Sequence, residues 1–396
     1  MSGRSRVPHR IAEPGGRLAA LGRLAQLAAG AAWERLGVST AALPATPQEV
    51  TPRWLSAALG AEVRAVKLIG ASVGTSTRGS LAVSYGPSPP GAPRSRRVFV
   101  KCTSTLAQRL MLGLGGFLHG EPGFYGVVRR ELEIEAPVGY HAAVDGRSWR
   151  SIVVIEDVAD TRGASFWQPG VSLPREALED LVEIMARWHG ATWASPRLER
   201  WRWLRTPAEQ LRVIDALVPL ADRAPVGARR ARAVIPPRLR DDHRRLHEGM
   251  RRSLAIASRG PRTYLHGDLH VANTYRTSSG RMGVVDWQTT LKGGWAHDFA
   301  YLLITAPEPA QRRRWERELL ALYLERLAGA GGPRLEHEQA WLDYRRATLY
   351  PYFAWTYTLG RSRLQPEFQP AEVSLTMIER ITAAIDELRS LEAVGL

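Results

Sequence analysis

Hydrophobic and polar positions alternate along much of residues 60–156, the pattern that predicts β-strands. Val63–Val73 and Ser80–Tyr85 alternate on either side of a turn rich in Gly, Ser and Thr, so they predict a hairpin. Arg97–Cys102 and the apolar run Ser151–Glu156 predict two further strands. This part of the chain is expected to form a small sheet, with a helix inserted after the third strand.

Helical periodicity dominates from Pro174 to the C-terminus. Apolar residues recur every three or four positions in Glu176–Trp193, Arg312–Leu327 and Ala371–Leu391, which predicts three helices. Thr263–Trp287 interrupts the pattern with short strand and loop signals. The chain is therefore expected to join a small sheet to a large helical part, which is an α+β fold.

The N-terminal 50 residues precede the sheet pattern. Arg17–Leu36 is rich in Ala and Leu and predicts an amphipathic helix that packs on the body of the protein. Thr51 suits the N-cap of a helix and Pro52 its first position, so a short helix is expected to follow and to end near Leu59.

Composition adds limits to this picture. The 396 residues favour two or three folding units, and 44% of them are hydrophobic, enough for a sizeable core. Cys102 is the only cysteine, so no internal disulfide and no cysteine-based zinc site can form, which suits a reducing cytoplasm. No apolar run reaches the roughly 18 residues of a membrane span, so no membrane-spanning helix is expected.

The formal charge of +15 arises from 54 basic and 39 acidic residues, and only three of the basic residues are lysines. Such a bias towards arginine is more typical of a GC-rich genome than of selection for arginine chemistry. The charge permits contact with nucleic acid or anionic membranes. Because no nucleic-acid-binding motif accompanies it, no nucleic-acid partner is expected.

One stretch carries recognisable chemistry. Tyr264–Asn273 reads YLHGDLHVAN, and a predicted hairpin leads from it to Asp286 in the run VVDW. His266, Asp268 and Asn273 keep the order of the protein-kinase catalytic loop, with Asn273 five residues after Asp268. Asp286 matches the metal-binding aspartate that follows this loop in protein kinases.

This spacing makes sense for phosphoryl transfer. A carboxylate on a rigid loop, here Asp268, can orient an acceptor hydroxyl and accept its proton. Asn273 and Asp286 supply the hard oxygen ligands that Mg²⁺ prefers. The HGD run also invites comparison with a hydrolase triad, but no G-x-S-x-G elbow accompanies it.

The run H-G-D-L-H-x-x-N…D-W-Q resembles the aminoglycoside phosphotransferase and choline kinase superfamily, as does GWAHDFAY at residues 294–301. Within the superfamily, the chain looks most like the ecdysteroid-kinase-like bacterial phosphotransferase branch. The resemblance covers roughly residues 50–360. It implies a two-lobed protein-kinase-like fold, with a small β-sheet N-lobe, a large helical C-lobe, and ATP and Mg²⁺ as cofactors.

The resemblance also implies roles for single residues. His266 would support the catalytic loop around the base, Asp268, and Asp298 would brace that loop. Lys101 would hold the α- and β-phosphates, and Glu121, in an element that resembles E-x-x-F-Y, would pair with Lys101. Other candidates for that glutamate are Glu131, Glu133 and Glu135.

Two further elements would hold the nucleotide. The loop 74–79, chiefly Gly74, Thr75 and Ser76, resembles the phosphate-covering loop. Ile155–Val158 resembles the hinge between lobes, where the carbonyl of Glu156 and the amide of Val158 would hold adenine.

These observations predict an ATP-dependent phosphotransferase that acts on a hydroxyl of a small molecule. The expected divisions are an N-terminal extension over 1–50, an N-lobe over 51–156 and a C-lobe over 157–396. Alternatives are a catalytically silent, kinase-like nucleotide-binding module and a basic nucleic-acid-binding protein. The richness in Tyr and Trp favours a sterol-like or aromatic alcohol as acceptor over a polycationic aminoglycoside.

Overall fold

The computed structural model describes residues 22, 25, 43–87, 96–216, 220–361 and 369–396. The chain divides into two compact units, Met1–Ala164 with Asp286–Gln288, and Ser165–Val285 with Thr289–Leu396. We call them the sheet unit and the helical unit. The helix predicted over Arg17–Leu36 lies outside the described residues, apart from Gly22 and Ala25.

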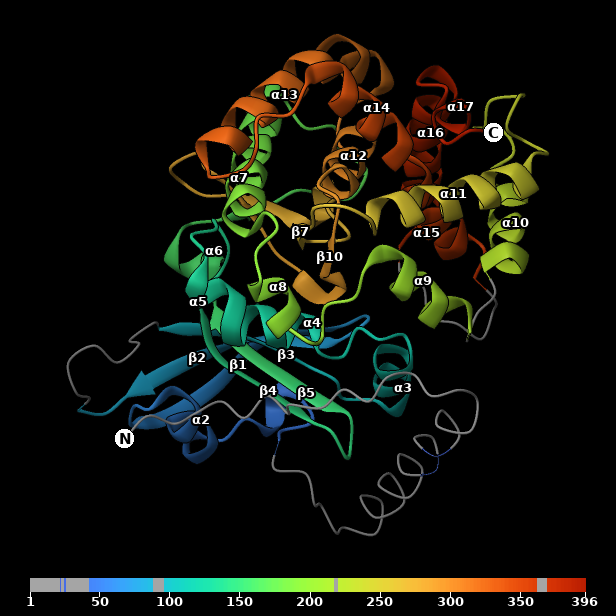
Figure 1. Ribbon diagram of the computed structural model, residues 1–396. Coiled ribbons are helices and arrows are strands. Elements are labelled where there is room, and N and C mark those ends of the chain that lie inside the picture. The colour runs from blue at the N-terminus through green and yellow to red at the C-terminus, as the bar shows by residue number, and fades with distance from the viewer. Residues whose placement is uncertain (1–21, 23–24, 26–42, 88–95, 217–219, 362–368) are drawn as a thin grey trace. The chain divides into compact units, whose positions relative to one another are not determined.

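The sheet unit is built on five antiparallel strands in the order β1-β2-β3-β5-β4 (Figure 1). Their bounds are β1 Val63–Val73, β2 Thr77–Tyr85, β3 Arg97–Cys102, β4 Gly139–Asp145 and β5 Arg150–Glu156. All four predicted strands are present, but β2 begins at Thr77 rather than at residue 80 and shortens the turn before it. Strand β4 was not among the predicted strands.

Short helices complete this unit. They are η1 Pro47–Glu49, α2 Pro52–Leu59, α3 Leu106–Leu114, α4 Gly120–Gly123, η2 Phe124–Val128, α5 Arg129–Glu131 and α6 Val158–Thr161. Helix α2 confirms its prediction, because the Thr51 hydroxyl accepts a hydrogen bond from Trp54 N at 3.2 Å and the helix ends before Gly60, which has φ +64°. One face of the sheet and α2 share a core of apolar side chains that includes Leu55, Leu81, Val98, Val100, Ile152 and Val154.

The helical unit contains most of the helices. They are α7 Arg175–Thr192, α8 Arg197–Arg200, α9 Pro207–Asp215, α10 Leu220–Arg230, α11 His243–Ala257, α12 Ala296–Thr305, α13 Pro309–Gly329, α14 His337–Ala347, α15 Leu349–Leu359, α16 Ala371–Glu387 and α17 Ser390–Ala393. The three predicted helices correspond to α7, α13 and α16, although α16 ends at Glu387 and α17 follows it.

Short strands of the helical unit carry the segment with the recognisable motif. They are β6 Ser165–Phe166, β7 Thr263–Leu265, β8 Thr274–Arg276, β9 Met282–Val284 and β10 Leu291–Gly293. Strands β8 and β9 form the predicted hairpin, and β6 pairs with β8. The two units confirm the α+β class, with a small sheet lobe and a large helical lobe.

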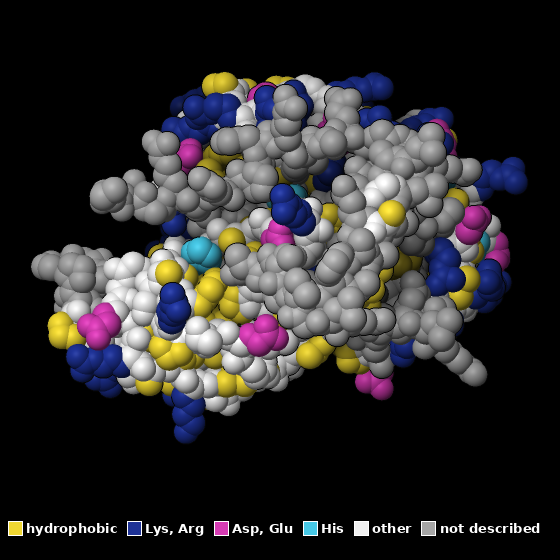
Figure 2. All heavy atoms as spheres, turned by 90° about the horizontal axis from the view of Figure 1, so that it is seen from below, with side chains coloured by type: hydrophobic (Ala, Val, Ile, Leu, Met, Phe, Trp, Pro, Cys, Tyr) yellow, Lys and Arg dark blue, Asp and Glu magenta, His cyan; other side chains and the backbone are white. Residues whose placement is uncertain are grey.

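The charged side chains are mixed over the described part of the face in Figure 2, where Lys and Arg lie singly or in small groups and Asp and Glu lie among them. Some of the exposed charged side chains form ion pairs, as in Arg232 with Asp241 at 2.6 Å and Arg245 with Asp242 at 2.9 Å. Within the described residues, no helix is long and apolar enough to cross a membrane.

Candidate active site

The turn between β1 and β2 holds the residues expected to cover phosphates. Val73 pairs with Thr77, so the turn consists of Gly74, Thr75 and Ser76 alone, and the expected loop 74–79 is corrected to these three residues. The Gly74 N–H donates to the Ser76 carbonyl at 2.9 Å. The turn is therefore tight and internally hydrogen-bonded.

A side chain from α3 anchors this turn. Gln108, which is 5% exposed, donates from Nε2 to the Gly74 carbonyl at 2.9 Å. Its Oε1 accepts from Ser104 N at 2.9 Å, and Thr105 caps the same helix in a capping box. No local pattern of residues indicates this role of Gln108, because only the fold brings α3 beside residue 74.

Lys101 lies between two carboxylates. Its Nζ is 2.7 Å from Glu121 Oε1 and 3.1 Å from Asp286 Oδ1. The side chains of Lys101 and Glu121 are each 8% exposed, whereas that of Asp286 is 30% exposed. The structure thus selects Glu121, and not Glu131, Glu133 or Glu135, as the partner of Lys101.

Two acids sharing one base explain the electrostatics of this cluster. Burial lowers the pKa of Lys101, but Asp286 and Glu121 outweigh it, so the pKa lies above its ordinary value. Burial raises the pKa of Glu121 to about 7, with Lys101 lowering it and Asp286 raising it. Asp286 therefore contributes most to keeping Lys101 charged, and Glu121 is the acid whose charged form burial disfavours.

The helix that carries Glu121 is irregular. Pro122 and Gly123 limit α4 to Gly120–Gly123, and the chain continues through the π-helical turn Phe124–Val128. Phe124 stacks on Trp287, with ring centroids 3.9 Å apart and an angle of 6° between the planes. This stacking ties the short helix to the residue that follows Asp286.

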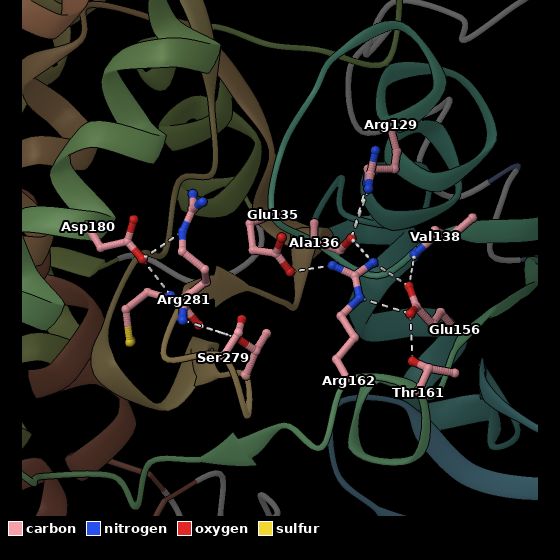
Figure 3. A network of polar contacts seen from close by, with 12 residues as sticks. Arg129, Glu135, Ala136, Val138, Glu156, Thr161, Arg162, Asp180, Ser279 and Arg281 are labelled. Carbon is pink, nitrogen blue, oxygen red and sulfur yellow. Dashed lines mark hydrogen bonds and ion pairs between the residues drawn. The ribbon is translucent and has the colours of Figure 1, made fainter.

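The predicted hinge has a buried ion pair instead of free acidic side chains (Figure 3). The Glu156 carboxylate accepts from Val138 N at 3.0 Å, from Thr161 Oγ1 at 2.6 Å and from Arg162 Nε at 2.9 Å. Arg162 also pairs with Glu135. The Glu156 side chain is thus structural. Val158 is the first residue of α6, so its N–H has no partner within that helix.

In the helical unit, Asp298 holds the backbone of the catalytic loop. Its Oδ2 accepts from His266 N at 2.6 Å and its Oδ1 from Gly267 N at 2.9 Å. Gly267 has φ +83°, and a β-carbon there would lie 2.3 Å from the Thr289 carbonyl oxygen, so only glycine fits. Asp298 is completely buried, and although burial raises its pKa, His189 contributes most to lowering it below its ordinary value.

Two side chains fix the loop on either side of Asp268. His266 Nε2 lies 2.9 Å from the Val285 carbonyl, and its Nδ1 accepts from Asp268 N at 3.2 Å, which requires the tautomer with the proton on Nε2. Asn273 donates from Nδ2 to the Asp268 carbonyl at 2.8 Å. These bonds hold the backbone at Asp268 and leave its carboxylate for other partners.

The Asp268 side chain is 35% exposed, although most of its neighbours are buried. His270 Nε2 lies 3.6 Å from Asp268 Oδ2. Burial raises the pKa of Asp268, but His270, a hydrogen bond from Tyr301, and His266 together lower it below its ordinary value. The carboxylate is therefore ionised at neutral pH.

Asn273 in the helical unit and Asp286 in the sheet unit each carry an oxygen atom of the kind that magnesium prefers. The Asn273 nitrogen is used by Asp268, which leaves Oδ1 as the ligand atom. Asp286 has φ +63°, an unusual conformation for a residue other than glycine, and such strain is often found at functional sites. Among the described residues, no group of three or more His, Cys, Asp or Glu is placed to hold a metal ion.

His189 is a core residue that also contacts Asp298, the residue that holds the catalytic loop. It is fully buried, its Nδ1 lies 2.7 Å from the Tyr323 hydroxyl, and its Nε2 lies 3.5 Å from Asp298 Oδ2. Helices α7, α12 and α13 contribute one residue each to this group. No local sequence signal connects them, so sequence reasoning could not find the contact.

Three solved structures of kinases and phosphotransferases are similar to this chain. A search of curated protein sequences finds no match. The chain is similar to the solved structure of a choline kinase from Streptococcus pneumoniae, with 13% identity, a TM-score of 0.45, and coverage of 85% of this chain and 97% of that one. A macrolide 2'-phosphotransferase from Brachybacterium faecium matches with 15% identity, a TM-score of 0.40, and coverage of 77% and 88%. An ethanolamine kinase from Plasmodium vivax matches with 12% identity, a TM-score of 0.41, and coverage of 82% and 83%.

One family model matches the chain, and it is described as the phosphotransferase enzyme family. The match covers residues 118–344, more than half of the chain, and includes Glu121, the catalytic loop and Asp298. The two lobes are those of a protein-kinase-like fold, and the finer ecdysteroid-kinase-like branch stays a prediction. The chain belongs to the phosphotransferase enzyme family.

Proposed function

We propose that this protein transfers the γ-phosphoryl group of ATP to a hydroxyl of a small molecule. The observation that carries the proposal is that the backbone of Asp268 is fixed while its carboxylate stays accessible. Its backbone is held through Asp298, His266 and Asn273, while its carboxylate is 35% exposed and its pKa is lowered. An ionised carboxylate on a rigid loop is the group that such a transfer requires.

Asp268 acts as the base. It accepts a hydrogen bond from the acceptor hydroxyl and takes its proton while the hydroxyl oxygen bonds to the γ-phosphorus and ADP leaves. His266 and Asp298 do not touch the reacting atoms in this scheme. They are positioning residues that fix the backbone of the loop.

The nucleotide is held by the sheet unit in this proposal. Lys101, oriented by Glu121, binds the α- and β-phosphates, and the backbone of Gly74–Ser76 covers them. The Glu156 carbonyl and the Val158 amide bind adenine. The ion pair that occupies the Glu156 side chain supports this role, because it leaves only backbone groups at the hinge to contact a base.

Asn273 Oδ1 and the Asp286 carboxylate are the proposed ligands of Mg²⁺. When bound, this ion neutralises charge on the phosphate oxygens. Asp286 is prepared for that task by its 30% exposure and by its contact with Lys101 Nζ at 3.1 Å. Lys101 and Asp286 are thus expected to act on the same phosphates.

The surroundings of Asp268 suggest the type of acceptor. Burial is the main cause that raises the pKa values of Tyr301 and Tyr350, and the charge of Asp268 adds to it, so both rings lie within the field of Asp268. His270 contacts the Trp355 ring with centroids 5.4 Å apart. A polycationic acceptor needs an acidic pocket, whereas these neighbours are aromatic rings, so we favour an aromatic or sterol-like alcohol.

The proposal is tested by an ATP-consumption screen over a library of hydroxylated metabolites, with the Asp268→Asn variant as the blank. A hit is an alcohol that makes the wild type, but not the blank, release ADP and that gains a phosphate by mass spectrometry. Acceptor-independent release of ADP at the same rate in both proteins would contradict the proposal.

The metal assignment has a separate test in nucleotide binding. Asp286→Ala should bind ATP more weakly in the presence of Mg²⁺, because one of the two proposed ligands is lost. Thermal shift with ATP, with and without Mg²⁺, measures this without turnover. Equal stabilisation of the wild type and the variant by ATP and Mg²⁺ would contradict the assignment.

A further inference from the structure

Three polar side chains form one row across the sheet. Ser72 on β1 pairs with Arg78 on β2, and Arg78 pairs in turn with Lys101 on β3. Residues directly opposite each other in antiparallel strands point to the same face. Arg78 therefore shares a face of the sheet with Lys101, next to the turn 74–76.

The guanidinium of Arg78 is held over that turn. Its Nε donates to the Ser72 hydroxyl at 3.0 Å, which fixes the plane of the group. Its Nη2 lies 3.5 Å from the position of a β-carbon built on Gly74. Since Gln108 anchors the Gly74 carbonyl, both the turn and the guanidinium above it are fixed before any ligand arrives.

The charge of Arg78 lacks a partner of its own. Lys101 has two carboxylates, but among the described residues none lies within ion-pair distance of Arg78. Burial is the main effect that raises the pKa of Glu121, and the charge of Arg78 is among those that lower it, so Arg78 lies within the field of this cluster. An anion bound above the turn would give the Arg78 guanidinium the ion-pair partner that it lacks among the described residues.

We propose that Arg78 is a second cationic ligand for the terminal phosphates of the nucleotide, acting beside Lys101. This inference rests on the proposed function and extends it to a residue that the motif did not assign. A guanidinium offers two parallel N–H donors to phosphate oxygens, whereas an ammonium acts as a point charge. Arg78 thus adds directional hydrogen bonds over the turn. The ligand class that it would recognise is a nucleoside triphosphate.

The test measures the binding of ATP, ADP and AMP, each with Mg²⁺, to the full chain by calorimetry. The variants are Arg78→Met, which removes the charge, and Arg78→Lys, which keeps it. Arg64→Met is the matched control, because Arg64 is also an exposed arginine of the sheet and pairs with Glu62 at 3.4 Å.

Arg78→Met should bind ATP about 10-fold more weakly, roughly the worth of one charge-assisted hydrogen bond, while AMP affinity stays within about twofold. Arg78→Lys should recover part of the loss, and Arg64→Met should bind as the wild type does. The melting temperature of Arg78→Met without nucleotide should stay close to that of the wild type, because Arg78 is exposed and its side chain forms no ion pair among the described residues.

Two results would overturn the inference. Wild-type affinity for ATP in Arg78→Met, together with weakened binding in Lys101→Met, would reject Arg78 and leave the proposed nucleotide site standing. An equal loss for ATP and AMP with a lower melting temperature would show that Arg78 only supports the fold. If the wild type itself bound no ATP, the proposed function would fail and the inference with it.

Discussion

The two units hold their candidate site residues in different ways. In the sheet unit, charged side chains contact each other directly, with Lys101 placed between Glu121 and Asp286. In the helical unit, side chains form hydrogen bonds to the backbone of the catalytic loop instead. Asp298 binds two peptide N–H groups, and Asn273 binds the Asp268 carbonyl.

This difference matches what each group has to do. A lysine that binds phosphates must keep its charge and its position, and two carboxylates provide both. A base must keep its carboxylate available, so the protein fixes the peptide groups around it and leaves the side chain 35% exposed. The charge cluster is therefore expected to respond to pH and to charge removal, and the loop to the loss of a hydrogen-bond acceptor.

The largest effect is expected for Asp268→Asn. The variant keeps the shape and one acceptor oxygen but loses the charge, so kcat should fall by about 10²–10⁴, the usual contribution of a general base. The affinity for ATP should change little, because Asp268 faces the acceptor. Steady-state kinetics and nucleotide binding on the same preparation check both expectations.

Asp180→Asn is the matched control for this variant. Asp180 lies in the same unit and accepts from Met282 N at 2.6 Å, as Figure 3 shows beside Arg281, but it belongs to no proposed site. Its kcat should equal that of the wild type. An Asp268→Asn variant that retained more than about a tenth of wild-type kcat would contradict the base assignment.

Asp298→Asn tests whether the hydrogen bonds from Asp298 to the backbone of the catalytic loop matter for activity. An amide nitrogen would then face the His266 or the Gly267 N–H, so the loop should shift. We expect kcat to fall by up to about 10²-fold, as small displacements of reacting groups can cause, and the free energy of unfolding to fall by about 1.5–3 kcal/mol. Kinetics and urea denaturation measure the two effects, and wild-type kcat in a destabilised variant would show that the brace serves stability alone.

Lys101→Met tests the charge cluster. Loss of the ammonium should lower kcat/KM for ATP by about 10- to 100-fold, the worth of a hydrogen bond between charged groups. Lys292→Met is the control, because Lys292 is also buried and pairs with Glu199 at 2.7 Å, in the helical unit. If both variants lost the same activity, the effect of Lys101 would be one of general stability.

The smallest effect concerns pH and stability. The folded-state pKa of Glu121, about 7, lies above its ordinary value of 4.5, so the folded protein binds a proton that the unfolded chain releases. This contribution to stability is complete below about pH 4.5 and is lost as pH rises through 7. Glu121→Gln should remove the loss of stability that Glu121 causes as the pH rises. Melting temperatures of the two proteins between pH 4.5 and 7.5 measure this difference. Identical pH profiles for the two proteins would place the Glu121 pKa near its ordinary value.

Local chemistry allowed much of the fold to be predicted. The Thr51-Pro52 start of α2, the alternation in β1 and β3 and the periodicity of α7 are all properties of neighbouring residues, and each element appears where expected. Strand β4 was missed because its alternation is weak. The expected phosphate loop was too long because its Gly, Ser and Thr residues resemble a turn, whereas pairing with β3 makes Thr77–Gly79 part of a strand.

The sequence by itself determined the catalytic-loop motif, the family and the small set of candidate side chains, because the residues of the loop are fixed in spacing along the chain. Only the tertiary structure decided which partners those side chains have. Glu121 rather than a later glutamate meets Lys101, Gln108 holds the turn, and Arg78 stands opposite Lys101. Strand register and helix packing set these contacts, and both depend on the burial of apolar surface across the whole fold, which no local pattern of residues encodes.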